Sequence, residues 1–126
     1  MSFSNTLETS VLKWAFTTDA VTRPTTWYVA LYTSNPADDN SGTELSGSAY
    51  ARVSASFTVS GNQATTSANV EFAEATGSWG TVSHVAVFDA STSGNMLAYA
   101  ALTTSKVISS GDVLRIPAGD LDITLD

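Results

Sequence analysis

Few side chains in this sequence combine the residue types and the spacing that catalysis requires. The single histidine, His84, lies in an apolar run, and no nucleophile or orienting carboxylate stands at a recognisable spacing from it. Glu71, Glu74 and Asp89 could in principle supply the two carboxylates of a glycoside hydrolase. Scattered carboxylates are usually solvent-facing charges, however. We therefore predict no catalytic residues and no enzymatic activity.

An oxygen-rich segment is the candidate for metal binding. Residues 38–44 read Asp-Asp-Asn-Ser-Gly-Thr-Glu, which places carboxylate and amide oxygens beside a glycine, as calcium-binding loops do. The segment departs from the EF-hand pattern in the spacing of its acidic groups around Gly42. We interpret it as a solvated loop. The chain has no cysteine, which excludes disulfides and thiolate metal sites, and we predict no cofactor and no metal.

Aromatic side chains offer a different kind of site. Trp27, Tyr28, Tyr32, Trp79 and Tyr99 could stack on sugars, as in a carbohydrate-binding module. Aromatic residues also fill the cores of β-sandwiches and are enriched at oligomer interfaces. The sequence leaves these alternatives open.

Composition and charge limit the classes of partner. Five basic and twelve acidic residues give a net charge of −7, which disfavours nucleic-acid binding because phosphate neutralisation needs lysine and arginine. No apolar run approaches the roughly 20 residues that a membrane-spanning helix needs, and the start of the chain does not read as a secretory signal. We expect a soluble protein that stays in the cell that makes it until a larger assembly carries it away, and that binds neither nucleic acid nor membrane.

One helix is expected, over about residues 4–17. Its apolar positions fall at helical spacing and comprise Phe3, Leu7, Val11, Trp14 and Ala15. Asn5 can cap its first turn, with Glu8 reaching back to it. We expect this helix to cover one end or face of a sheet, and docking on a partner protein is the alternative.

The central strand is expected at residues 26–33. Trp27, Val29 and Leu31 alternate there with other apolar or amphipathic residues, so both faces of the strand can be covered, as in a strand inside a sheet. The segment 34–48 follows it without periodicity. A connection of that length inside a domain is usually functional or mobile.

The remaining chain reads as short strands separated by turns. The expected strands are 49–59, 63–73, 81–89, 96–103, 107–108, 113–116 and 121–125, with a hairpin turn at 60–62. Hydroxyl-rich strands joined by glycine-bearing turns indicate an all-β fold. We predict an antiparallel β-sandwich or jelly-roll-like barrel of about seven to eight strands with one N-terminal helix, forming a single domain over residues 1–126.

The 34–48 loop and the residues just after it form the candidate interaction surface. Its candidate residues are Asn35, Asp38, Asp39, Glu44, Tyr50 and Arg52. Arg52 stands at the start of a strand just past the acidic loop. We expect it to anchor the loop through an ion pair with Glu44 or Asp38.

Several motifs, taken in order, resemble a family of small virion proteins of tailed bacteriophages. They are WYVALYTSNP (27–36), YARV (50–53), WGTVSHVAVFDA (79–90), SGNML (93–97) and GDVLRIPAGDL (111–121), and the similarity covers residues 7–126. Members of the family are labelled tail-fibre-like or minor structural proteins, and some similar small β proteins are capsid cement or decoration subunits.

The resemblance implies a virion structural protein without catalytic residues. It favours a capsid cement or decoration subunit, made in the host cytoplasm and bound to the major capsid protein. The alternative is a tail-fibre or tail-tip component bound to tail proteins. Because cement subunits usually act as oligomers around symmetry axes, a homo-oligomer is expected, with a homotrimer favoured.

Overall fold

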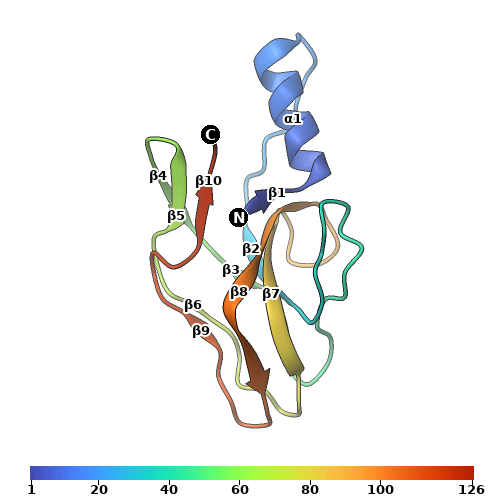
Figure 1. Cartoon of the computed structure of the whole chain (residues 1–126), viewed down its shortest axis with the longest axis vertical. Helices are drawn as coiled ribbons and strands as arrows, with labels where there is room; N and C mark the ends of the chain where they lie inside the picture. Colours follow the sequence, from blue (N-terminus) through green and yellow to red (C-terminus); the bar gives the residue numbers. More distant parts are fainter.

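The expected central strand lies inside the largest sheet of the molecule. The structure is a computed structural model that describes all residues 1–126, and Figure 1 shows its ten strands and one helix. The five-stranded antiparallel sheet has the order β1-β8-β7-β2-β3. Its strands are β1 (Ser2–Phe3), β8 (Met96–Ile108), β7 (Gly80–Phe88), β2 (Tyr28–Tyr32) and β3 (Val53–Ser54).

Both faces of β2 are covered, as its two-sided apolar pattern predicts. Val29 and Leu31 belong to the main core, a cluster of thirteen buried residues. Ala30 and Tyr32 point to the other face, where they join a second cluster of five that includes Phe88. The strand therefore links two cores, which is why nearly all of its side chains are buried.

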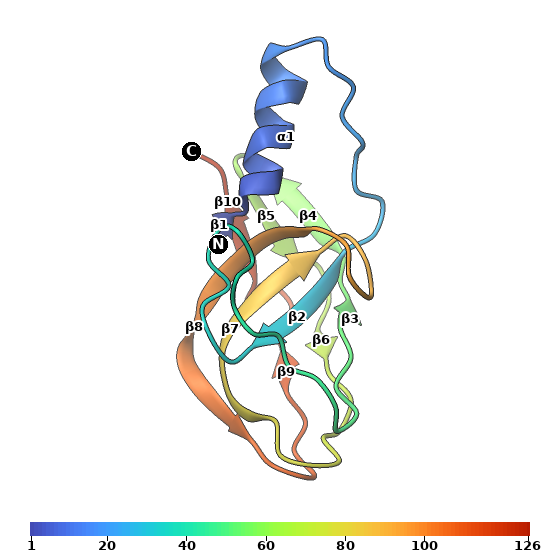
Figure 2. The same cartoon turned by 90° about the vertical axis from the view of Figure 1, so that its right-hand side faces the viewer.

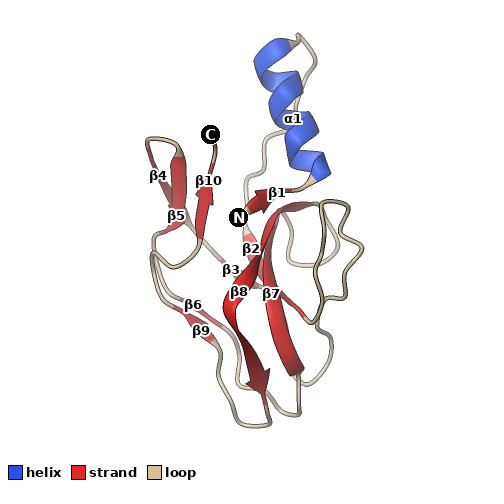
Figure 3. Ribbon diagram, in the orientation of Figure 1, coloured by secondary structure: helices blue, strands red, loops and turns tan.

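Two smaller sheets complete the β structure. One has the order β10-β5-β4, made of β10 (Asp122–Thr124), β5 (Gln63–Thr66) and β4 (Phe57–Ser60), and the other pairs β6 (Val70–Glu71) with β9 (Arg115–Ile116). All pairings are antiparallel. The predicted class is confirmed: the fold consists mostly of antiparallel β-sheets with one N-terminal helix (Figure 3).

The number and bounds of the strands differ from the prediction. The segments expected as the single strands 49–59 and 63–73 are each divided between two sheets. Their apolar alternation continues through the change of sheet, so it gives no sign of the break. Conversely, the two strands expected at 96–103 and 107–108 are one strand, β8, which passes through a register shift opposite β7.

The hairpin expected at residues 60–62 is present between β4 and β5. Ser60 pairs with Gln63, which leaves Gly61 and Asn62 as a two-residue turn. Gly61 has a φ of 59°, the positive value that the first position of a type II′ hairpin turn requires. This turn forms the outer end of the three-stranded sheet.

The helix α1 (Asn5–Phe16) projects from the body instead of covering the sheet (Figures 1 and 2). None of its residues is buried, and Trp14 and Phe16 are 75% and 80% exposed. The expectation that it covers the sheet is therefore wrong. The reason lies at its base, where β1 pairs with the edge of β8 and Ser4 N–H donates to the Leu97 carbonyl (2.8 Å), so that the helix starts at the end of the sheet.

The residue that caps the helix is also one position earlier than expected. The Ser4 hydroxyl accepts a hydrogen bond from the Leu7 N–H at 3.1 Å, and Asn5 is the first residue of the helix.

A cleft of about 350 Å³ separates one side of α1 from the returning chain. It is lined by residues that include Leu7, Val11, Trp14, Val21 and Leu97. With twelve residues, α1 is too short to span a bilayer as a helix.

Candidate interaction surface around the 34–48 loop

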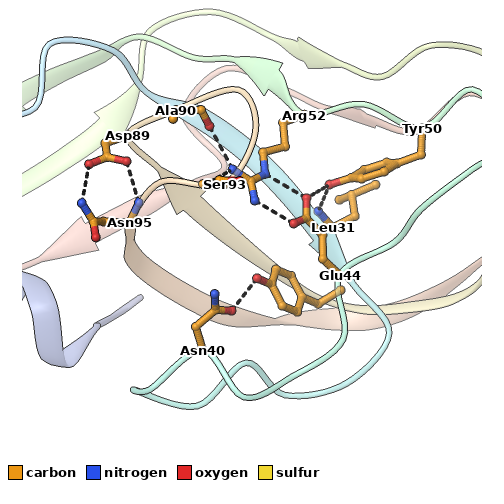
Figure 4. A network of polar contacts seen from close by, with 10 residues as sticks. Leu31, Asn40, Glu44, Tyr50, Arg52, Asp89, Ala90, Ser93 and Asn95 are labelled. Atoms are coloured by element: carbon orange, nitrogen blue, oxygen red, sulfur yellow. Dashed lines mark hydrogen bonds and ion pairs between the residues drawn. The ribbon is translucent and has the colours of Figure 1, made fainter.

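Arg52 anchors the 34–48 loop through Glu44, as one of the two expected pairings predicts (Figure 4). Its Nε donates to Glu44 Oε2 at 2.9 Å and its Nη2 donates to Oε1 at 2.8 Å, which is the two-bond geometry that suits arginine and a carboxylate. The Tyr50 hydroxyl donates to Glu44 Oε2 at 2.7 Å and accepts from the Leu31 N–H at 3.0 Å. The carboxylate thus joins the loop to β2.

The same guanidinium also holds the turn that follows β7. Its Nη1 donates to the carbonyl oxygens of Ala90 (3.0 Å) and Ser93 (2.8 Å), and its central carbon lies 3.6 Å from the ring centre of Phe88. Such a cation over an aromatic face is attracted to it. We call Arg52, Glu44 and Tyr50 the Arg52 network. It ties two separate loops together beside β2 (Figure 4).

Burial and charge in this network shift the pKa values of its groups. Burial, and then the hydrogen bond to Glu44, raise the pKa of Tyr50 far above its ordinary value. Burial and the charge of Glu44 raise the pKa of Tyr32 to about 12. Burial works against the charge of Arg52, but its hydrogen bonds and charge contact with Glu44 raise its pKa overall. Arg52 therefore stays charged, and the phenols of Tyr50 and of nearby Tyr32 stay neutral.

The outer part of the loop is fixed to the body as well. The Tyr32 hydroxyl donates to Asn40 Oδ1 at 2.6 Å, and the Tyr99 hydroxyl donates to the carboxylate of Asp38. The Asp38 carbonyl accepts from the Asn5 N–H at 3.0 Å, so the loop also contacts the base of α1. Asp38 is therefore not the partner of Arg52, and the loop is an ordered part of the fold.

Two local turns shape the loop between these anchors. Asn35 Oδ1 accepts from the Ala37 N–H at 2.9 Å, and Asp39 Oδ1 accepts from the Ser41 N–H at 3.1 Å. Gly42 packs tightly, since a Cβ built on it would lie 2.5 Å from the Asn35 carbonyl oxygen. The loop presents a defined surface as a result.

The six candidate residues fall into two groups. The side chains of Glu44, Tyr50 and Arg52 point inward and make the network. The other three, Asn35, Asp38 and Asp39, lie exposed on the loop. Sequence reasoning missed the carbonyl groups that Arg52 bonds after β7, because every residue carries a carbonyl and no residue type marks it.

The oxygen-rich segment does not gather its ligands. Asp38, Asp39 and Glu44 point to three different partners, and no group of three His, Cys, Asp or Glu side chains stands close enough to hold a metal ion. His84 lies on β7 with its Nδ1 2.8 Å from the Ser83 hydroxyl. Glu71 is exposed opposite Arg115 on the smallest sheet.

The remaining acidic and aromatic candidates are not gathered at one site. Glu74 is exposed, and Asp89 accepts two hydrogen bonds from Asn95, at 2.7 and 3.0 Å. Trp79 and Tyr32 are buried in the two cores, and Trp79 donates its indole N–H to a backbone carbonyl. Trp27, Tyr28 and Tyr99 are half-buried; the first two are neighbours at the start of β2, whereas Tyr99 lies on β8.

The structure thus combines antiparallel sheets, a loop held by the Arg52 network and an exposed helix. A family model described as Podophage GP4 fiber I protein gp80 matches residues 2–124. The chain belongs to this family of phage virion fibre proteins. A search of the curated proteins found no match.

The family confirms part of what the resemblance implies and corrects the rest. A bacteriophage virion structural protein is confirmed, and the family implies a non-enzymatic role. The favoured capsid cement position finds no support in this match. A fibre protein agrees instead with the alternative, a tail-fibre component.

Proposed function

We propose that the protein is a tail-fibre subunit that contacts other tail proteins of the virion through its 34–48 loop. The observation that carries the proposal is the rigid attachment of this exposed acidic loop by the Arg52 network. A loop that is already ordered loses little conformational entropy on binding, so its contacts contribute more fully to affinity. The match to a fibre protein family supports the same role.

The charge of the loop indicates the chemistry of its partner. Asp38 and Asp39 stand next to each other on its exposed surface, while the nearest basic residue along the chain, Arg52, is turned inward. A partner surface with lysine or arginine side chains fits this arrangement. We propose that such a surface belongs to a tail protein, and that subunits also associate with one another, with a homotrimer as the expected size.

Copy number in purified particles tests the position of the protein. A tail-fibre subunit is present in few copies per virion, and quantitative mass spectrometry against the major capsid protein measures the ratio. A ratio that corresponds to hundreds of copies would restore the cement hypothesis and refute this one.

The loop itself is tested by removing charge without changing shape. Asp38→Asn combined with Asp39→Asn keeps side chains that can still accept the loop's hydrogen bonds but removes two negative charges. We expect at least a tenfold loss of incorporation into particles during complementation. The control is Glu71→Gln with Glu74→Gln, which makes the same charge change at exposed positions elsewhere. Equal incorporation of both variants would exclude the loop as the contact.

A further inference from the structure

The helix α1 has apolar side chains on two sides, and one side has no cover. Leu12 and Phe16 are four residues apart, so they share a face, and they are 58% and 80% exposed. Trp14 lies on the opposite side with Leu7, beside the cleft. A helix of twelve residues is marginal in water without tertiary packing, and helices in proteins are stabilised mainly by packing an apolar face. The face of Leu12 and Phe16 therefore needs a partner surface.

The three-stranded sheet also has an exposed apolar face, and no helix covers it. Val59, Ala64 and Ile123 stand side by side across β4, β5 and β10, so their side chains share one face. Leu125 continues this row of the sheet, since its N–H donates to the Asn62 carbonyl at 2.9 Å. Val59 and Leu125 are 75% and 54% exposed. The outer end of the sheet is an uncovered apolar surface.

Within one chain these two surfaces stay apart. The strands that α1 contacts are β8 and β1, and Figure 1 shows the helix and the β4–β5–β10 sheet as separate projections at the same end of the molecule. We propose that the Leu12–Phe16 face of α1 in one copy packs on the uncovered sheet face, residues Val59, Ile123 and Leu125, of a second copy. This contact is independent of which tail protein the 34–48 loop binds.

Charge favours a second copy of this chain as the occupant. Residues 1–27 carry two acidic and two basic side chains, and the hairpin 57–66 carries no charged residue. Residues 28–126 hold the whole net charge of −7. Copies that met through most other surfaces would bring like charges together, which is costly. Helix on sheet is a contact that avoids much of this repulsion, because Asp122 and Asp126 alternate with Ile123 and Leu125 and so belong to the other face, where Asp122 accepts from the Thr65 hydroxyl.

The surface area buried by this helix–sheet contact indicates whether one contact is enough for a stable oligomer. About five side chains, each burying on the order of 100–200 Å², give less than the roughly 1,600 Å² of a standard stable interface. A single contact is therefore weak. A closed assembly, in which every copy uses both its helix and its sheet, doubles the area per subunit. We expect such a closed oligomer.

The chain has no cysteine, so introduced cysteines report this contact directly. Phe16→Cys and Val59→Cys are made in separate chains, mixed, and oxidised gently. We expect a disulfide between the two different chains to form at least tenfold faster than Phe16→Cys chains couple to each other. Val107→Cys is the control for Val59→Cys, because Val107 is 68% exposed on β8 and lies away from both surfaces.

Three outcomes would overturn the proposal. Equal coupling of Phe16→Cys with itself would indicate a helix-to-helix contact. A disulfide within one chain of the Phe16→Cys, Val59→Cys double variant would show that the helix folds onto its own sheet. A wild-type mass of 13.1 kDa by light scattering at about 100 μM would show a monomer. The exposed face of α1 would then be a contact for a different virion protein.

Discussion

Arg52 and Glu44 meet through two parallel hydrogen bonds, of 2.9 and 2.8 Å, at the point where the 34–48 loop returns to the sheet. Arg52 is the more enclosed of the two, with 7% of its side chain exposed against 25% for Glu44. The guanidinium of Arg52 lies over the face of Phe88 and also donates to two carbonyl groups of the following turn. One side chain therefore joins two loops that are far apart in sequence.

Removing Arg52 should be costly for stability. Arg52→Ala removes the cation that pairs with Glu44, which keeps the Tyr50 hydroxyl as a donor, and it leaves the Ala90 and Ser93 carbonyl groups without the donor that Arg52 supplies. We expect a loss of about 2–4 kcal/mol in the free energy of unfolding. Arg52→Lys keeps the charge but loses the two-bond geometry, so about half of that loss is expected. Urea denaturation measures both. The control is Arg115→Ala, at an exposed position where we expect little loss of stability. An equally small loss for Arg52→Ala would contradict the role of the network.

Stability should fall steeply in alkaline solution. The folded state raises the pKa of Tyr32 to about 12 and that of Tyr50 further, whereas tyrosines of the unfolded chain ionise near pH ~10. The contribution of both groups is fully present below that pH. It is lost as the pH rises towards 12 and beyond, because the unfolded state releases protons that the folded state keeps.

The free energy of unfolding, measured from about pH 8 upward, tests this dependence. Tyr50→Phe should reduce the slope above pH ~10, since it removes one of the tyrosines whose pKa the fold raises. It should also lower stability at neutral pH by about 1–3 kcal/mol, because the Leu31 N–H loses its acceptor. A slope that is unchanged in the variant would rule out Tyr50 as a source of the effect.

Gly42 should not tolerate a side chain. Its Cβ would lie 2.5 Å from the Asn35 carbonyl oxygen and 2.7 Å from Pro36 Cα, and both are backbone atoms that cannot turn away. We expect Gly42→Ala to destabilise the protein by about 1–3 kcal/mol and to increase proteolysis of the loop. Gly47→Ala is the comparison: its positive φ of 79° brings backbone strain, but no atom lies within 4 Å. A larger cost at Gly47 would contradict the packing argument.

The helix cap can be tested apart from the rest of the fold. Ser4→Ala removes the acceptor for the Leu7 N–H and should cost about 1 kcal/mol of helix stability. Hydrogen exchange of the first amides of α1 measures the effect locally. Asn5→Ala should have a smaller effect, because Asn5 lies inside the helix, and the reverse order would mean that Asn5 is the functional cap.

Much of the fold follows from pattern, and the exceptions have physical causes. The two-faced alternation of Val29 to Tyr32 predicts an inner strand, and β2 is one. The proximity of Glu44 and Arg52 along the chain made their pairing predictable. The division of the 49–59 segment between two sheets could not be predicted. Apolar alternation shows which residues share a face of a strand, but it does not show which sheet the strand joins.

The position of α1 shows a different limit. Leu7, Val11 and Trp14 have helical spacing and correctly predict a helix, but spacing does not reveal what a face will pack against. Leu12 and Phe16, on the other side, were an available signal that one sheet could not cover this helix. Their exposure became evident only from the arrangement of the chain in space.

The base of α1 has a mechanical consequence. The helix is joined to the body by two paired residues of β1 and by the hydrogen bonds that Ser4 and Asn5 make with Leu97 and Asp38, whereas β7 is held along its length by two neighbouring strands. Under tension applied through the helix, we expect these few bonds to break before the sheet shears. The base of α1 is therefore the part of the subunit that we expect to bend first under load.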